Sequence, residues 1–394
     1  MAAPSVPPTY RALQFTSSTT PPSLVSLPTP PLTASTALIR PLRANLFAYT
    51  RSIFTLSNPR GYHYPLPLVP GSTTIGRILS ASSDAPTLQS PSHLVFVSPV
   101  IRASDNSPTS ILHGLNSGPS AAGKALAARE WRNGSWGEVV RVPAGNVHLL
   151  DEHRLFNELG YTLDDLGYLQ SLMIVYGGLR DVDVRAGEVV LVAPATGSFG
   201  GAAVSVALAL GAGVIALGRN GEVLRELEGD TRRAYPGGRI STVVMTGEEG
   251  EDLEGIIRGA ARELGRRDGA VDVYFDMSPP SASQSAHIKA GIAALRPKGR
   301  MSLMGGVAGD VGFPYYQIMV KGLRLQGSWM FTPEQAGEVI RLVEAGILKL
   351  GEGAGAKCLG VFGLEEWEEA FRVAGDGARV ARFALFAPSG KEAQ

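Results

Sequence analysis

The chain has 394 residues, which is long enough for two domains that each bury a substantial core. Basic and acidic residues number 36 each, so the formal net charge is +0 and no overall field favours nucleic acid or an anionic membrane. The single cysteine, Cys358, excludes a disulfide framework and a zinc site built from cysteines, and it fits a reducing compartment. The most apolar windows are too short to span a bilayer. We therefore expect a cytoplasmic protein that binds neither nucleic acid nor membrane.

The chain up to about Val147 is rich in proline, serine and glycine. Short runs rich in β-branched residues alternate there with turn residues, which is typical of a small all-β unit. These runs are residues 37–42, 73–79, 93–99 and 137–143.

From about Arg185 the pattern changes to short apolar runs that alternate with longer, helix-like segments. Continuous apolar strands with helices between them predict a parallel sheet that is covered on both faces. The runs are residues 188–194, 213–218, 241–247, 270–277, 300–306 and 323–329. Residues 162–182 form a predicted bridging helix between the two parts. Two further predicted helices, 332–346 and 364–374, precede a closing strand at 379–386.

A glycine-rich turn follows the first strand of the second part. Ala195, Gly197 and Gly200 occupy the three fingerprint positions of a G-x-G-x-x-G motif, with alanine at the first. In such a turn Gly197 lets the backbone approach a pyrophosphate and Gly200 lets the helix pack close to the strand, while the helix N-terminus faces the phosphates. The alternative is an ordinary strand-to-helix turn. The predicted cofactor turn comprises Ala195, Thr196, Gly197, Ser198, Phe199 and Gly200.

The next strand ends at Gly218, eighteen residues after Gly200. Near this distance an acidic residue usually holds the ribose diol of NAD. The sequence has Gly218, Arg219 and Asn220 instead, so no carboxylate repels an additional phosphate. Arg219 can grip a 2′-phosphate through charge-assisted bonds, with Asn220 as a further donor. We predict NADPH as the cofactor; the alternative is that Arg219 only begins a solvated helix.

Three segments in this order resemble the medium-chain dehydrogenase/reductase superfamily: residues 69–78, 185–212 and 294–306. The resemblance implies an α/β fold, in which a GroES-like, β-rich catalytic domain accompanies a Rossmann domain with a doubly wound parallel sheet. It places the N-terminal part of the catalytic domain at 1–160. The NADP-binding domain with its bridging helix then covers 161–328, and residues 329–394 return to the catalytic domain.

The departures from this family concern zinc. Zinc-dependent members carry His-Glu where this sequence has Ser72 and Thr73, and their cysteine ligands have no counterpart here. The six histidines show no paired spacing. The chain therefore resembles the zinc-independent branch, which includes quinone oxidoreductases and enone reductases, and we expect no metal. Without zinc, a substrate that delocalises the developing charge is favoured, namely a polarised C=C or a quinone.

Four side chains are candidate catalytic groups. By resemblance, Asn45 orients the substrate and Tyr49 protonates it, while Ser72 stands at the former metal-ligand position. Tyr176, in the bridging helix, is a fourth candidate, although a tyrosine there is by default a packed aromatic with a wet tip. An aspartate that is common after the Asn in relatives is absent here, which leaves the proton donor open.

Resemblance also points to the ends of the last three strands as the nicotinamide side of the site. Ligands of open α/β sheets bind at such carboxyl ends, although ordinary turn chemistry would also explain these residues. The residues are Ser278, Met304, Gly305, Gly306 and Ser328.

Relatives commonly pair the edges of their nucleotide sheets, here near residues 315–329, so we expect a homodimer. The leading interpretation is a zinc-independent, NADPH-dependent reductase of an enone or quinone. A carbonyl reductase or secondary-alcohol dehydrogenase without zinc, or a non-catalytic NADPH-binding protein, remain alternatives.

Overall fold

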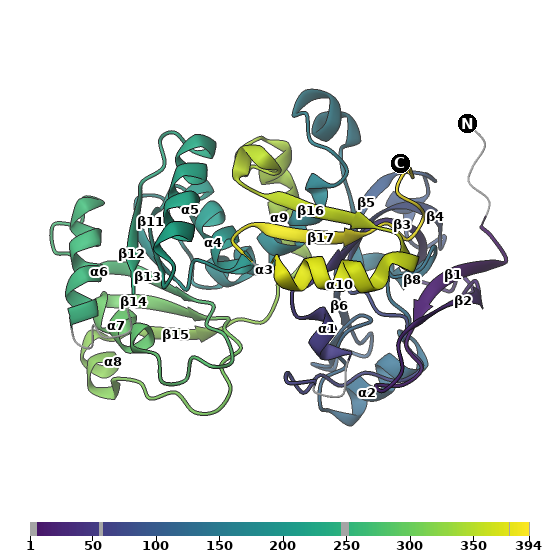
Figure 1. Ribbon diagram of the computed structural model, residues 1–394, viewed down its shortest axis with the longest axis horizontal. Coiled ribbons are helices and arrows are strands. Elements are labelled where there is room, and N and C mark those ends of the chain that lie inside the picture. The colour runs from purple at the N-terminus through teal and green to yellow at the C-terminus, as the bar shows by residue number, and fades with distance from the viewer. Residues whose placement is uncertain (1–5, 55–57, 246–251, 378, 394) are drawn as a thin grey trace. The chain divides into compact units, whose positions relative to one another are not determined.

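A computed structural model describes residues 6–54, 58–245, 252–377 and 379–393 (Figure 1). The chain divides into two compact units. Unit 1 comprises Met1–Gln170, Cys358–Ala378 and Arg382–Gln394, and unit 2 comprises Ser171–Lys357 and Arg379–Ala381. The two parts of the α/β fold predicted from the sequence are confirmed. None of the helices in the described ranges combines the length and apolar character that crossing a bilayer requires.

Unit 1 is built on an antiparallel sheet. Within the described residues its seven strands run in the order β16-β17-β3-β4-β5-β9, with β8 paired to β3, and two hairpins, β1-β2 and β6-β7, flank it. The strands are β1 (Thr9–Gln14), β2 (Ser23–Pro28), β3 (Thr36–Leu46), β4 (Thr74–Ala81), β5 (Leu94–Val97), β6 (Val100–Arg102), β7 (Ser110–Leu112), β8 (Val140–Pro143), β9 (Val147–Leu149), β16 (Lys357–Phe362) and β17 (Arg382–Phe386). The helical elements are α1 (Thr50–Ile53), η1 (Pro86–Leu88), α2 (Ala121–Arg129), η2 (Ala144–Asn146), η3 (His153–Glu158), η4 (Asp165–Tyr168), η6 (Leu364–Glu366) and α10 (Trp367–Asp376).

Unit 2 is a doubly wound parallel sheet. In the described part of the chain it has six strands in the order β12-β11-β10-β13-β14-β15. They are β10 (Val189–Ala193), β11 (Gly213–Gly218), β12 (Ile240–Val244), β13 (Val271–Asp276), β14 (Leu295–Leu303) and β15 (Arg324–Gly327). The helical elements are α3 (Leu169–Asp181), α4 (Ser198–Ala209), α5 (Gly221–Ala234), α6 (Asp252–Glu263), α7 (Ala286–Ala294), α8 (Tyr315–Lys321), α9 (Pro333–Glu344) and η5 (Glu352–Ala354). Of the strand predicted at 241–247, the last two residues lie outside the described ranges.

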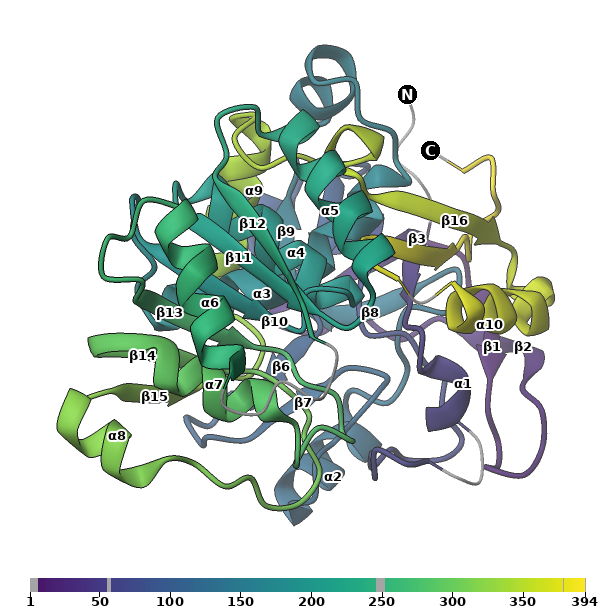
Figure 2. The same ribbon diagram turned by 60° about the vertical axis from the view of Figure 1, so that its left-hand side comes forward.

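The apolar runs account for this sheet. All residues of β10, β11 and β13 are buried, as strands covered on both faces require. Leu191 and Ile215 pack into one core with Leu253 and Ile257 of α6 and Ile288 of α7. The helices α4 and α5 pack on strands β10 to β12 (Figure 2). The carboxyl ends of the strands thus meet at one edge, where the glycine turn lies.

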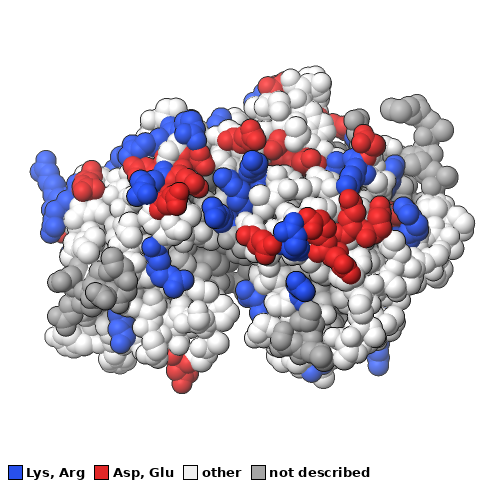
Figure 3. All heavy atoms as spheres, in the orientation of Figure 1, with Lys and Arg blue, Asp and Glu red and all other residues white. Residues whose placement is uncertain are grey.

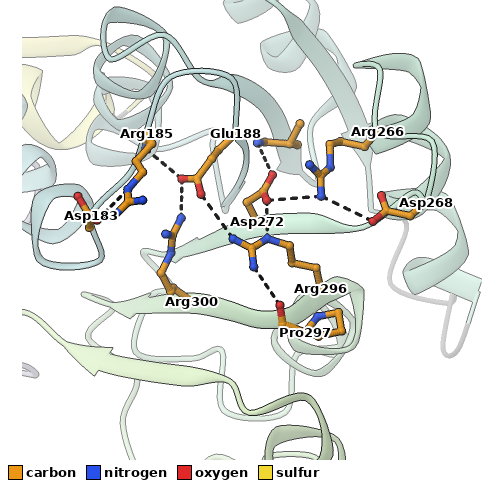
Figure 4. A network of polar contacts seen from close by, with 10 residues as sticks. Asp183, Arg185, Glu188, Arg266, Asp268, Asp272, Arg296, Pro297 and Arg300 are labelled. Carbon is orange, nitrogen blue, oxygen red and sulfur yellow. Dashed lines mark hydrogen bonds and ion pairs between the residues drawn. The ribbon is translucent and has the colours of Figure 1, made fainter.

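A network of charges closes the opposite edge, at the amino ends of the strands (Figure 4). Asp272 accepts a bond of 2.9 Å from the backbone N–H of Val189 and one of 2.6 Å from Nε of Arg296. Glu188 accepts from Arg300 at 2.5 Å. These carboxylates are nearly buried, and the arginines compensate their charges. The network therefore belongs to the stability of unit 2.

The boundaries of the units differ from those expected from the sequence. The chain enters unit 2 after Gln170 rather than after residue 160, and it returns to unit 1 at Cys358 rather than at 329. The reason lies in α9, which stays with unit 2: Glu338 on α9 accepts hydrogen bonds from Tyr176 and Arg180 on α3.

Candidate functional site

The glycine turn has the shape that its sequence predicts. The strand β10 ends at Ala193, and Gly197 is the N-cap of α4. A Cβ added to Gly200 would lie 2.2 Å from the carbonyl oxygen of Pro194, so the helix approaches the strand too closely for any side chain. A Cβ added to Gly197 would meet no atom within 4 Å. Gly200 thus serves packing, whereas Gly197 borders open space at the N-terminus of the helix.

The end of β11 carries no carboxylate. A Cβ added to Gly218 would lie 2.5 Å from Cγ2 of Thr196, in the turn, so a larger residue there would require the Thr196 side chain to move. The exposed Arg219 follows, with no hydrogen bond or ion pair to any residue in the described ranges. Asn220 has a role that the sequence did not predict. Its Oδ1 caps α5 by accepting from the backbone N–H groups of residues 222 and 223, which leaves Nδ2 as the possible donor.

The predicted nicotinamide-side residues lie together at the ends of β13, β14 and β15. The N–H of Met304 donates to the carbonyl of Asp276 at 3.1 Å, and that of Gly306 donates to the carbonyl of Ser278 at 2.9 Å. A Cβ on Gly305 would lie 2.5 Å from Oδ2 of Asp276. The N–H of Ser328 bonds to residue 303, whereas its Oγ is buried without a partner among the described residues. This hydroxyl is therefore available to a ligand.

The hydroxyl of Ser278 is engaged in a chain of buried hydrogen bonds that the sequence did not reveal. It donates to Oδ1 of Asp276 at 2.5 Å and lies 2.8 Å from Nε2 of His287. Because Ser278 gives its proton to the carboxylate, it accepts from Nε2–H, and Nδ1 accepts from Ser285 at 2.5 Å. Burial, together with the charge of Arg219, lowers the pKa of His287 to about 4, so the imidazole is neutral. Ser278 therefore holds the turn after β13 in place.

The residues at this edge fit a nicotinamide dinucleotide that carries a 2′-phosphate. Gly197 leaves room beside the helix N-terminus for a pyrophosphate, and Arg219 is a cation without a partner in the described ranges. No acidic side chain occupies the end of β11, where a ribose diol would be held.

Two of the predicted catalytic residues lie at one end of the sheet of unit 1. The register pairs Ala44 of β3 with Thr74 of β4, so Asn45 and Ser72 follow and precede this pair at the same end. The amide nitrogen of Asn45 donates to the carbonyl of Gly167 at 2.7 Å. Ser72 is 4% exposed, and its Oγ has no partner among the described residues. Of the two, Ser72 has the hydroxyl that is available to a ligand.

Tyr49 lies just beyond β3, immediately before α1. Its ring stacks on Phe47 at 5.2 Å between centroids, and the guanidinium of Arg60 lies 3.8 Å from the ring centroid. An open pocket of about 350 Å³ adjoins it, lined on the other side by residues of α10 such as Phe371. Burial and the neighbouring Tyr62 raise the pKa of Tyr49, and Arg60 lowers it in part.

Tyr176 is placed differently from the other three candidates. It belongs to unit 2, and its hydroxyl donates to Oε2 of Glu338 at 2.6 Å. Burial and this bond to a carboxylate raise the pKa of Tyr176 above its ordinary value. The proton of Tyr176 is thus held by Glu338 on α9.

The described residues do not fit a zinc ion. Within them no group of three His, Cys, Asp or Glu side chains could hold a metal. The thiol of Cys358 donates to the carbonyl of Gly360 at 3.5 Å, and burial raises its pKa to about 11, so it is not a thiolate.

Comparisons with known proteins agree with this architecture. Residues 199–345 match the family model described as zinc-binding dehydrogenase. The whole chain has the fold of solved dehydrogenases and reductases. A segment of unit 2 thus matches a dehydrogenase family model, and the chain as a whole shares the dehydrogenase fold.

Several solved dehydrogenases and reductases are similar in fold to the chain over nearly its full length. A putative alcohol dehydrogenase from Sinorhizobium meliloti is 21% identical, with a TM-score of 0.69 and coverage of 97% of both chains. A thermostable alcohol dehydrogenase from Pyrobaculum aerophilum is 19% identical, with a TM-score of 0.70 and coverage of 96% of this chain and 100% of that one. The crotonyl-CoA carboxylase/reductase AntE, solved with NADP, is 15% identical, with a TM-score of 0.73 and coverage of 98% and 96%. At these identities the solved structures show the fold alone.

Proposed function

We propose that this protein is a zinc-independent, NADPH-dependent member of the medium-chain dehydrogenase/reductase superfamily, which reduces a polarised C=C, as in an enone, or a quinone. The observation that carries the cofactor assignment is the end of β11, where Gly218 offers no carboxylate to a ribose diol and the exposed Arg219 is a cation without a hydrogen bond or ion pair in the described ranges. The fold similarity to a crotonyl-CoA carboxylase/reductase solved with NADP supports the same assignment.

Bound NADPH would supply a hydride, two electrons and one proton nucleus, to the β-carbon of the enone or to the quinone. The glycine turn and Arg219 hold the cofactor, and Ser328 offers a hydroxyl on its nicotinamide side. Negative charge then develops on the carbonyl oxygen of the substrate, and hydrogen-bond donors stabilise it. We assign this role to Ser72 and the orientation of the substrate to Asn45. A proton from Tyr49 or from solvent completes the addition of two electrons and two protons.

The choice of substrate class follows from the donor set. A saturated ketone concentrates the charge on one oxygen and relies on a Lewis acid such as zinc. The described residues lack a zinc donor set, and hydroxyl and amide donors suit an enolate or hydroquinone anion, in which the charge is delocalised.

The test is the oxidation of NADPH and NADH by the purified protein in EDTA, with cyclohexenone, menadione and cyclohexanone as acceptors. We expect NADPH-dependent formation of cyclohexanone from cyclohexenone, or reduction of menadione, with products identified by mass and retention. Equal rates with NADH and NADPH would contradict recognition of the 2′-phosphate by Arg219. Turnover that requires zinc would contradict the metal-free mechanism.

A second candidate is a carbonyl reductase or secondary-alcohol dehydrogenase without zinc. The observation in its favour is the fold shared with two solved alcohol dehydrogenases. Conversion of cyclohexanone to cyclohexanol would select it, with Tyr49 as the acid. A non-catalytic NADPH-binding protein would bind NADPH and turn over none of the acceptors.

We also propose a homodimer formed at the outer edge of the sheet of unit 2. The helix α8, which precedes the edge strand β15, exposes large apolar side chains: Tyr315 is 81% exposed, Tyr316 72% and Val320 59%. Such a patch beside an open strand edge favours pairing with a second copy. Acidic and basic side chains intermingle on the face seen in Figure 3, which suits a small-molecule substrate better than nucleic acid. A cytoplasmic location stays part of the proposal.

A further inference from the structure

Unit 1 buries an amide side chain that has no hydrogen-bond partner. Gln170, the second residue of α3, is 1% exposed, and neither its Nε2 nor its Oε1 bonds to a described residue. A buried polar group left without a partner costs about 1–3 kcal/mol, so such groups are rare unless something else satisfies them. Gln170 therefore has both a hydrogen-bond donor and a hydrogen-bond acceptor that are buried without a partner among the described residues.

A second unpartnered group, the Oγ of Ser72, lies at the same end of the unit. Ser72 precedes β4, next to the end of β3 that holds Asn45. Asn45 donates to the carbonyl of Gly167, three residues before Gln170. The element η4, which contains Gly167, contacts both β3 and β4. The topology thus brings Ser72 and Asn45 to one end of the sheet, and Gln170 follows two residues after the segment that contacts both strands.

Another buried amide in unit 1 shows the contrast. Asn146 is 8% exposed, and its Nδ2 donates to the carbonyl of Ser98 at 2.9 Å and to that of Val100 at 2.8 Å. A buried amide that serves the fold thus finds its hydrogen-bond partners in the backbone of the folded chain. Gln170 is buried more deeply than Asn146, yet its side chain makes no hydrogen bond to a described residue.

We propose that Gln170 and Ser72 bind the carbonyl group of the substrate, a role that rests on the reductase function proposed above. The Nε2–H of Gln170 and the hydroxyl of Ser72 donate to the carbonyl oxygen. The Oε1 of Gln170 remains to accept from an O–H or N–H beside that carbonyl. The site therefore selects unsaturated carbonyl compounds with a hydrogen-bond donor next to the carbonyl, such as α,β-unsaturated amides.

The first experiment measures stability without a ligand. Gln170→Met keeps the length of the side chain and removes its polar atoms, so the melting temperature should stay equal or rise, because an unsatisfied group is removed. Asn146→Leu, the matched control, should lower the melting temperature. A loss with Gln170→Met as large as that of the control would mean that Gln170 serves the fold through a buried water, and it would overturn the proposal.

The second experiment measures binding, so it does not depend on turnover. Cinnamamide and methyl cinnamate differ in the N–H beside the carbonyl. The wild-type protein should bind cinnamamide about 3- to 10-fold more tightly, as one additional hydrogen bond allows, and Gln170→Met should lose this preference. The same preference in the variant would overturn the proposal. Absence of turnover with every acceptor would instead contradict the reductase function. The binding preference tests the role of Gln170 independently of turnover.

The third experiment asks whether the two side chains share one ligand group. Ser72→Ala and Gln170→Met should each lower kcat/KM, and the double variant should lose less than the product of the two single losses. If the loss in kcat/KM of the double variant equalled the product of the two single losses, the two side chains would act independently. The proposal that they bind one carbonyl group would then be wrong.

Discussion

The hydroxyl of Tyr176 donates a hydrogen bond of 2.6 Å to Oε2 of Glu338, which also accepts from Nε of Arg180 at 3.2 Å. The bond joins α3 to α9, which are 162 residues apart at this contact. A proton held by a carboxylate is given up with difficulty, and the raised pKa of Tyr176 agrees with this. The geometry thus favours Tyr176 as a link between two helices over Tyr176 as a catalytic acid.

Tyr176→Phe should therefore lower stability by about 1–2 kcal/mol, as the loss of a hydrogen bond to a charged group does, and leave kcat within about twofold of the wild-type value. Chemical denaturation and steady-state turnover measure the two effects. Glu338→Gln is the matched control, because it weakens the same link from the other side. A large fall in kcat with unchanged stability in the Tyr176→Phe variant alone would return Tyr176 to the catalytic set.

Arg219 sets the preference for the phosphorylated cofactor. Arg219→Ala should weaken NADPH binding about 10- to 100-fold, which is the range for charge-assisted bonds to one phosphate, and leave NADH binding unchanged. Fluorescence titration at two salt concentrations measures both affinities. Arg233→Ala, which removes an exposed arginine paired with Asp230 on α5, is the control and should change neither affinity. An equal loss for NADH and NADPH would contradict the phosphate contact.

The two glycines of the cofactor turn should respond differently to a methyl group. Gly200→Ala places Cβ 2.2 Å from the carbonyl oxygen of Pro194 and should destabilise the free protein by about 1–3 kcal/mol or more. Gly197→Ala meets no atom in the free protein and should leave its melting temperature unchanged. Because the added methyl projects into the space assigned to the pyrophosphate, NADPH binding should weaken. Full binding by the Gly197→Ala variant would show that the pyrophosphate lies elsewhere.

The sequence predicted the elements whose pattern is local. The apolar runs became β10, β11 and β13, and the turn with Gly197 and Gly200 has the predicted geometry, because strand burial and glycine contacts follow from neighbouring residues. The amphipathic pattern of α9 predicted a helix but not which core it joins, so the return to unit 1 was placed too early.

The sequence did not predict contacts between residues that only the folded path of the backbone brings together. Ser278 meets His287 only because the turn after β13 leads back onto α7. The isolation of Gln170 depends on which distant segments cover it, and no spacing in the sequence encodes that. Asn220 was predicted as a phosphate donor, although its place before a helix was itself a sign of an N-cap.

Acid should destabilise both units through a buried histidine. Burial lowers the pKa of His113 in unit 1 and of His287 in unit 2 to about 4, from an ordinary value of 6.5. Between these values the unfolded chain binds more protons than the folded one, so stability is complete above pH 6.5 and falls as the pH decreases toward 4. His287→Asn should flatten the pH dependence of the melting temperature, whereas His153→Asn, at a side chain 75% exposed, should not. Equal pH profiles for all three proteins would contradict a neutral, buried His287.

The charge network at the amino ends of the strands should dominate the stability of unit 2. Asp272→Asn removes the buried charge that faces Arg296 and Arg266, and it leaves these half-buried guanidinium groups only their longer ion pairs with Glu188 and Asp268 (Figure 4). Breaking a fully buried pair from one side costs about 3–5 kcal/mol, and because these arginines are partly exposed we expect a smaller loss, about 2–3 kcal/mol, in urea denaturation. Glu369→Gln is the control, because its pair with Arg372 on α10 is exposed and high dielectric weakens it. It should change the midpoint very little. If both variants unfolded at the same urea concentration, the network would be no stronger than a surface pair, and the parallel sheet would owe its stability to the apolar strands alone.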